Sequence, residues 1–133
     1  MNETLTIIRK KELANAEVML RSDGIIHFYV KANVTLTGND AKEMVKATGE
    51  IGNNKKFPIL ISSGKYGMAD VDAREYAASP DGNKYTIAGA LVVKSLAQKL
   101  LGNAYIKVNK PTTPTALFND EEKAIEWLKT FIK

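Results

Sequence analysis

Short apolar runs and longer segments of helical periodicity alternate along this chain of 133 residues. The runs are rich in β-branched and aromatic residues and keep either a two-residue period or a continuous apolar pattern, both of which indicate strands. In the longer segments, apolar side chains recur every three or four positions, which indicates helices. The pattern predicts strands at 5–8, 16–21, 25–30, 57–61, 86–93 and 105–108, and helices that open at 37–40, 70–72, 94–95 and 119–120.

Turn and cap residues mark the ends of several elements. The string Ser22-Asp23-Gly24 predicts a tight turn, because glycine adopts positive φ without steric cost, so residues 16–30 are expected to form an antiparallel hairpin. Gly52 and Gly102 are each followed by asparagine and are predicted to end the first and third helices. Residues 109–115 contain two prolines and are predicted to form a loop.

The order β-β-β-α-β-α-β-α-β-α predicts an α/β fold. Strands separated by helices require crossover connections and therefore a sheet with a parallel core, and the leading hairpin makes that sheet mixed. Residues 57–61 are almost continuously apolar, which predicts a central strand covered on both faces. Because no repeat or linker interrupts the order, we expect a single domain over residues 1–133.

Composition removes several classes of function. The chain has no cysteine, which excludes disulfides, thiolate metal sites and cysteine nucleophiles. His27 is the sole histidine, so no metal site, no catalytic set and no cofactor is expected. The net charge of +4 comes from interspersed residues rather than from one basic stripe, which argues against nucleic-acid binding. Without a secretory signal or an apolar run near the roughly 20 residues of a membrane span, we expect a cytoplasmic protein.

Candidate binding residues cluster where predicted strands end. In open α/β sheets, ligands bind outside the carboxyl ends of the strands, and the loop 62–69 and the junction at Lys94 are expected to share that edge. The loop contains glycines, serines and a lysine, a composition that can hold an anion. The candidate binding residues are Ser62, Ser63, Lys65, Tyr66, Met68, Asp70, Asp72 and Ser95.

These residues also have purely structural interpretations. The serine–glycine string lacks the spacing of a phosphate-binding loop, and Ser95 can simply cap the third helix. Asp70 can cap the second helix and form a surface pair with Arg74, four residues later. Tyr66 and Met68 form either a patch that contacts a partner or a part of the core.

The C-terminal half of the chain resembles a known family. The strings ALVVKSLA at 90–97, LLGNAYIKVNKP at 100–111 and PTALFNDEEKAIEWL at 114–128, with the element order from residue 12 on, are similar to the STAS/SpoIIAA-like group. The likeness is greatest to uncharacterised, stand-alone bacterial members. The resemblance implies a SpoIIAA-like (STAS-like) mixed β-sheet with four helices, in which an N-terminal hairpin is followed by β-α units. It implies no assigned activity.

The same resemblance raises the question of phosphorylation. STAS anti-sigma-factor antagonists carry a phosphorylatable serine, in a string similar to Asp-Ser-Ser-Gly, at the start of the helix after their third strand. Here Ser62-Ser63-Gly64 directly follows strand residues, and the predicted helix start carries Asp70 and Asp72 instead. A permanent carboxylate at a helix N-terminus supplies charge without a switch. Regulatory phosphorylation is therefore not carried over to this chain.

Three functions remain as hypotheses. The first is a non-enzymatic regulatory module that binds a protein partner or a second copy through the edge at 62–78. It predicts an exposed apolar patch near Tyr66, Met68 and Tyr76 and no deep cavity. The second is a domain for a small anionic or apolar ligand, or a lipid, which predicts a concave apolar pocket with a few convergent polar groups. The third, an enzyme with a carboxylate site, predicts a strongly shifted pKa in such a pocket.

Overall fold

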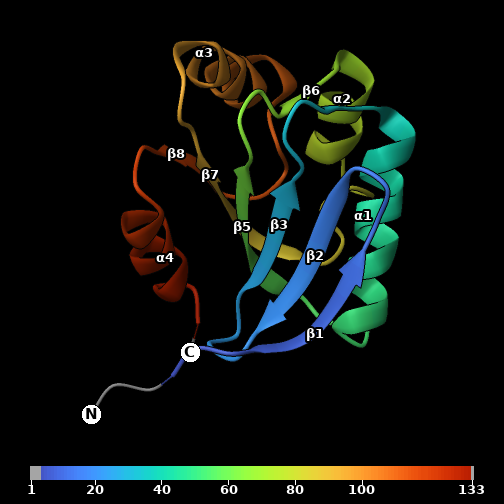
Figure 1. Ribbon diagram of the computed structural model, residues 1–133, viewed down its shortest axis with the longest axis vertical. Helices are drawn as coiled ribbons and strands as arrows, with labels where there is room; N and C mark the ends of the chain where they lie inside the picture. Colours follow the sequence, from blue (N-terminus) through green and yellow to red (C-terminus); the bar gives the residue numbers. More distant parts are fainter. Residues whose placement is uncertain (1–3, 133) are drawn as a thin grey trace.

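A six-stranded sheet forms the centre of the structure, a computed structural model that describes residues 4–132 (Figure 1). The strands lie in the order β1-β2-β3-β5-β7-β8. Their bounds are β1 Ile7–Glu12, β2 Ala16–Arg21, β3 Ile26–Val30, β5 Phe57–Ser63, β7 Thr86–Val92 and β8 Thr115–Phe118. A second, smaller sheet pairs β4 (Thr35–Leu36) with β6 (Met68–Ala69).

Helices cover both faces of the large sheet (Figure 1). On one face lie α1 (Gly38–Ile51) and α2 (Val71–Ala78), and α4 (Glu121–Lys129) packs on β5 and β7 from the other. The helix α3 (Leu96–Ala104) continues directly into a π-helical turn, η1 (Tyr105–Asn109), and lies at the end of the molecule toward which the parallel strands run. Each face buries its own apolar cluster, one beneath α1 and one beneath α4.

The predicted hairpin and the predicted parallel core are confirmed. β2 and β3 pair antiparallel around a turn in which Gly24 has a φ of 83°. β5 pairs parallel with both β3 and β7, and its neighbouring side chains Ile59 and Leu60 are buried in different clusters. Thr37 caps α1, because its hydroxyl accepts from the Asp40 N–H while the Asp40 carboxylate accepts from the Thr37 N–H.

The prediction of a strand at 105–108 is wrong. These residues continue α3 as the π-helical turn η1, and the last strand is β8, which begins where the loop 109–115 was expected to end. The reason is Gly102, which lies inside α3 rather than beyond its end. A Cβ atom on this glycine would lie 2.7 Å from Leu117 Cδ2. Gly102 therefore permits a close approach between α3 and β8 and does not stop the helix.

The first strand also extends further than predicted, over Ile7–Glu12 rather than 5–8. Its polar side chains belong to the outer edge of the sheet, where Lys11 Nζ lies 2.5 Å from Glu50 Oε2 of α1. Charged side chains on an edge strand discourage pairing with other chains. The polar residues after position 8 therefore indicate that the strand lies at the edge of the sheet, and they do not mark where the strand ends.

Two glycines give opposite expectations for substitution by alanine. A Cβ atom at Gly82 would lie 2.0 Å from the Tyr76 carbonyl oxygen, whereas at Gly89, in β7, the nearest atom is Thr115 Oγ1 at 3.9 Å. We expect Gly82→Ala to lower the free energy of unfolding by about 1–3 kcal/mol. Gly89→Ala should leave it unchanged or raise it by up to about 1 kcal/mol. Urea unfolding followed by circular dichroism measures both values, and equal losses would contradict the crowding at Gly82.

Candidate functional site

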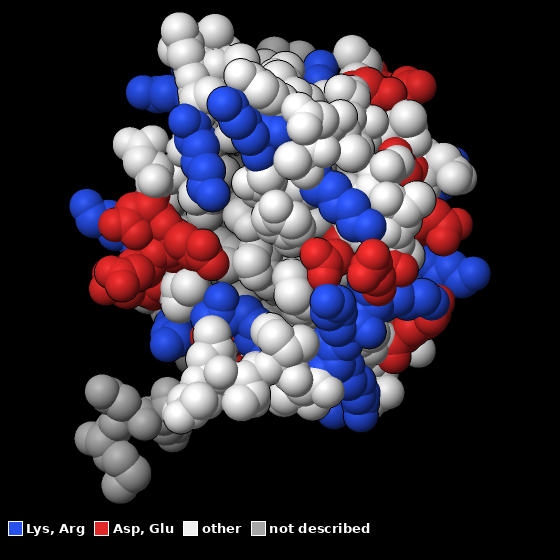
Figure 2. Space-filling model, viewed as in Figure 1, with Lys and Arg blue, Asp and Glu red and all other residues white. Residues whose placement is uncertain are grey.

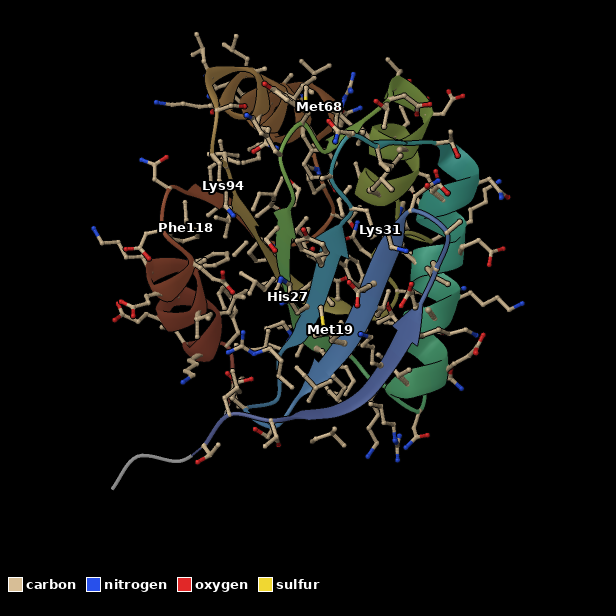
Figure 3. The ribbon with its side chains drawn as sticks, in the orientation of Figure 1. Met19, His27, Lys31, Met68, Lys94 and Phe118 are labelled. Atoms are coloured by element: carbon tan, nitrogen blue, oxygen red, sulfur yellow. The ribbon has the colours of Figure 1, made fainter. Side chains whose placement is uncertain are left out.

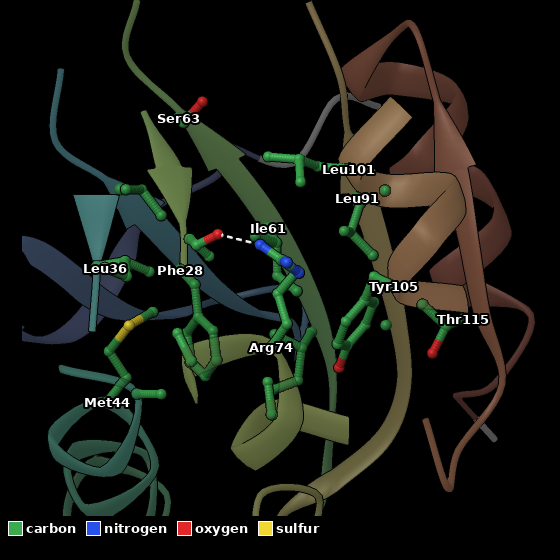
Figure 4. A pocket seen from close by; sticks show the side chains of 18 of the residues that line it. Phe28, Leu36, Met44, Ile61, Ser63, Arg74, Leu91, Leu101, Tyr105 and Thr115 are labelled. Atoms are coloured by element: carbon green, nitrogen blue, oxygen red, sulfur yellow. Dashed lines mark hydrogen bonds between the residues drawn. The ribbon is translucent and has the colours of Figure 1, made fainter. Parts of the chain in front are cut away.

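A cavity of about 210 Å³ lies between the sheet and the layer formed by α2 and α3 (Figure 4). Phe28 of β3, Ile61 of β5 and Leu91 of β7 contribute its sheet side. Met44 of α1 and Leu101 of α3 add further apolar walls. Most of the surface that a bound molecule would meet is therefore apolar.

Small side chains keep this space open. Ala73 and Ala77 of α2 line the cavity, and their spacing of four residues places them on one face of the helix. β7 adds Gly89 to the lining, whereas Val71, a larger apolar residue of α2, is exposed. A helix that presents alanines to a sheet cannot fill the volume between them, so the cavity follows from the sequence of α2.

One cationic side chain extends into the cavity. Arg74 of α2 lies in the wall, and its Nη1 donates a hydrogen bond of 2.5 Å to the carbonyl oxygen of Ala69 (Figure 4). Within residues 4–132, no carboxylate oxygen lies within 4.0 Å of its guanidinium. A guanidinium has five N–H donors, so Arg74 retains donors for an anionic group in the cavity.

The predicted surface pair between Asp70 and Arg74 is wrong. The predicted capping of α2 by Asp70 is confirmed, because its Oδ1 accepts from the Ala73 N–H at 2.8 Å. Arg74 is the functional candidate that the sequence analysis missed. The only signal in the sequence was indirect: its helix has too few large apolar residues to cover a sheet completely.

Tyr105, the first residue of η1, supplies a second polar group. Its side chain extends into the same cavity as Arg74, with its hydroxyl pointing away from the guanidinium (Figure 4). Burial raises the pKa of Tyr105 well above its usual value, which keeps the phenol neutral and able to donate a hydrogen bond. π-Helical turns occur frequently at functional sites, and here the turn begins at the residue that reaches the cavity.

Three of the candidate binding residues, Ser62, Ser63 and Met68, line the cavity. The Ser63 hydroxyl belongs to a polar bridge to α3, in which Gln98 Nε2 donates to Ser63 Oγ at 2.8 Å and to the Gly67 carbonyl oxygen at 3.0 Å. This bridge ties the loop after β5 to α3. It fixes the two elements that border this part of the cavity.

The other five candidates lie outside the cavity wall. Lys65 and Tyr66 are exposed, with Lys65 Nζ 5.1 Å from the centre of the Tyr66 ring. Asp70 and Ser95 cap α2 and α3, as their structural interpretation predicts. Asp72 is exposed in the first turn of α2, where a carboxylate interacts favourably with the helix dipole.

His27 meets a serine that the sequence did not place near it. His27 Nε2 and Ser62 Oγ share a hydrogen bond of 2.6 Å between β3 and β5, and the labelled side chain lies on the sheet in Figure 3. The two residues are 35 positions apart, and only the parallel register of the strands brings them together. Ser62 is 5% exposed, which leaves its hydroxyl little access to a substrate or to a kinase.

Neither a metal cluster nor a membrane span is found in the described part of the chain. Residues 4–132 contain no group of three or more His, Cys, Asp or Glu side chains placed to hold a metal ion. In the same region, no helix has both the length and the apolar character that a bilayer crossing demands.

Comparisons with known proteins bear on the fold. A family model described as a domain of unknown function (DUF7793) matches residues 18–132. Among solved structures, the chain is similar to an uncharacterized protein of the DUF3478 family from Shewanella loihica PV-4, described as having a SpoIIAA-like fold. The two are 14% identical with a TM-score of 0.56, over 96% of this chain and 98% of that one. No curated protein matches. The predicted SpoIIAA-like fold is therefore confirmed.

His27 gives a testable pH dependence. Burial, the largest influence, lowers the pKa of His27 below its usual value of 6.5, against a smaller raising effect of Glu121. Below pH 6.5 the unfolded chain binds a proton at His27 more readily than the folded chain does. Acidification toward the lowered pKa therefore destabilises the fold. We expect the free energy of unfolding to fall between pH 7 and pH 5.5, and to fall less in His27→Gln, whose amide can still bond to Ser62. Urea unfolding at both pH values measures this, and an identical fall in both proteins refutes it.

Proposed function

We propose that this chain, which belongs to the DUF7793 family of domains of unknown function, binds a small apolar molecule that carries an anionic group. The observation that carries the proposal is the apolar cavity with Arg74 in its wall. A concave apolar pocket with a few convergent polar groups is what the ligand-binding hypothesis predicts.

The size of the cavity fits a ring system or a short hydrocarbon chain. An engineered apolar cavity of about 150 Å³ holds benzene, and the cavity here measures about 210 Å³. Each methylene group that moves from water into such a space contributes about 0.8 kcal/mol. The apolar part of the ligand would therefore supply much of the affinity.

The polar groups favour an anionic substituent. Arg74 has one hydrogen bond to a carbonyl oxygen and no carboxylate within 4.0 Å among residues 4–132. A carboxylate, sulfonate or phosphate can accept two parallel hydrogen bonds from a guanidinium, and such charge-assisted bonds are about twice as strong as neutral ones. The Tyr105 hydroxyl adds a neutral donor in the same cavity.

Two matched dyes test the two parts of this proposal separately. Anilinonaphthalene sulfonate and N-phenylnaphthylamine share a ring framework, but only the first is anionic. We expect the wild-type protein to bind both. Arg74→Met should weaken binding of the sulfonate dye by roughly 10- to 100-fold, the value of a hydrogen bond to a charged group, and should leave the neutral dye almost unaffected. Fluorescence titration measures all four dissociation constants.

Two further variants serve as controls. Arg9 Nη1 donates to the Ile51 carbonyl oxygen at 3.0 Å, but Arg9 lies outside the cavity wall, so Arg9→Met should bind both dyes normally. Gly89 shares one face of β7 with Leu91, so Gly89→Val should fill the cavity and weaken both dyes. Dye binding that survives Gly89→Val would lie elsewhere and would contradict the proposal. Circular dichroism checks that each variant is folded, because the sulfonate dye also binds partly folded states.

A second candidate function, the regulatory binding of a protein partner or a second copy, is favoured by Tyr66. Its side chain is 66% exposed, and its φ of 64° is unusual for an aromatic residue. Met68 lines the cavity and Tyr76 packs against the cluster beneath α1, so Tyr66 is the most exposed member of the predicted patch. Strained backbone is frequent where a structure serves a function rather than its own stability.

The variant Tyr66→Gly tests this second candidate without disturbing the fold, because glycine adopts a positive φ at low cost. If Tyr66 contacts a partner, affinity capture from the native cell with the wild-type protein should recover that partner. The same experiment with Tyr66→Gly should lose it. The variant should unfold at the same urea concentration or higher. Recovery of the same proteins by both, or of none by either, is the result that argues against this edge.

A further inference from the structure

The outer surface of α3 and η1 is apolar although it faces solvent. Leu96, Leu100 and Val108 are 72%, 62% and 75% exposed. Leu96 and Leu100 are four residues apart, which places them on one helix face. The other side of the same segment presents Leu101 and Tyr105 to the cavity. A helix with apolar residues on both sides is expected to have a second apolar contact.

The charges carried by this segment of the chain have a single sign, although Asp72 and Glu75 of the neighbouring α2 are exposed and acidic. From residue 82 to residue 119 the chain contains no aspartate or glutamate. Within that stretch, four exposed lysines belong to α3, η1 or their ends: Lys94, Lys99, Lys107 and Lys110. On the face shown in Figure 2, basic and uncharged side chains lie over α3, acidic side chains lie at the same end on the side of α2, and a larger acidic cluster lies below, over α4.

We propose that this surface, the lysines and exposed apolar side chains of residues 94–110, docks on an anionic lipid bilayer. Aliphatic side chains of a short amphipathic helix enter the boundary between headgroups and acyl chains, while lysines bind the anionic headgroups. Lysine stems also lie along apolar surface while their ammonium groups stay in water. Protein interfaces are depleted in lysine, which favours a lipid surface over a protein partner for this combination of residues.

The position of α3 connects this surface to the cavity. One helix, with a diameter of about 10 Å including side chains, separates Leu96 and Leu100 from the cavity walls that Leu101 and Tyr105 form. A docked protein would hold its cavity next to a source of apolar molecules with anionic groups. This connection rests on the proposed ligand-binding function, whereas the docking itself rests only on the surface residues.

Sedimentation with lipid vesicles tests the docking. We expect the wild-type chain to sediment with vesicles of phosphatidylcholine and phosphatidylglycerol, weakly with phosphatidylcholine alone, and less at high salt. Lys99→Gln/Lys107→Gln should weaken binding roughly 30-fold, since each lysine near an anionic surface contributes to attraction in this range. Leu96→Ser/Leu100→Ser should also release the protein. Both changes lie on exposed positions, so neither is expected to affect folding.

Lys123→Gln/Lys129→Gln on α4 is the matched control, because it removes the same charge from exposed positions of another helix. The proposal is overturned if the control loses as much binding as Lys99→Gln/Lys107→Gln, if neutral and anionic vesicles bind equally, or if no vesicle binds. Size-exclusion chromatography tests the alternative that a second copy covers the surface. If the wild-type protein is a dimer and Leu96→Ser/Leu100→Ser is a monomer, the surface belongs to a second copy and not to a bilayer. Arg74→Met should bind vesicles normally, which separates a failure of docking from a failure of the ligand site.

Discussion

The parallel pairing of β5 between β3 and β7 is the constraint on which the rest of the structure depends. Because these strands run in the same direction, their carboxyl ends meet at one edge, where the loop after β5 and the beginning of α3 are joined through Gln98. The same register brings the His27 imidazole to Ser62 on the neighbouring strand. The parallel pairing of β3, β5 and β7 therefore forms the sheet side of the cavity and also brings His27 to Ser62.

The side chains on the two faces of the sheet fill the available space to different extents. Beneath α4, large side chains such as Ile25, Leu60 and Leu128 are fully buried and fill their space. Beneath α2, alanines and a glycine leave volume open, and unfilled volume forfeits dispersion contacts. A partly buried guanidinium adds a further cost because it loses hydration. Beneath α1, in contrast, Val18, Ile26 and Ile59 are as fully buried as the residues beneath α4, so the open volume is confined to the part of this face that α2 and α3 cover.

Local chemistry accounts for what the sequence could predict. The hairpin turn at Gly24 and the caps Asp70 and Ser95 depend on neighbouring residues alone and are found where a pattern predicted them, and Thr37 caps the helix whose start was predicted at 37–40. The rest depends on contacts between distant segments. The role of Gly102 is visible only against Leu117 of β8. Nothing local distinguishes an arginine that turns inward from one in a surface pair, so Arg74 could not be identified from its spacing to Asp70.

The π-helical turn η1 is a place where the chain could lose one residue without disturbing the sheet. Such a turn holds one residue more than the α-helical turn it replaces. Loss of one residue from η1 would restore the regular helical repeat just before Lys110, whose left-handed backbone ends the helix. The pairing of β7 with β8 would not need to change, because the segment between η1 and β8 lies outside the sheet. The loop that follows can therefore absorb a single-residue change in chain length at this turn, while Leu101, Gly102 and the strands keep their places.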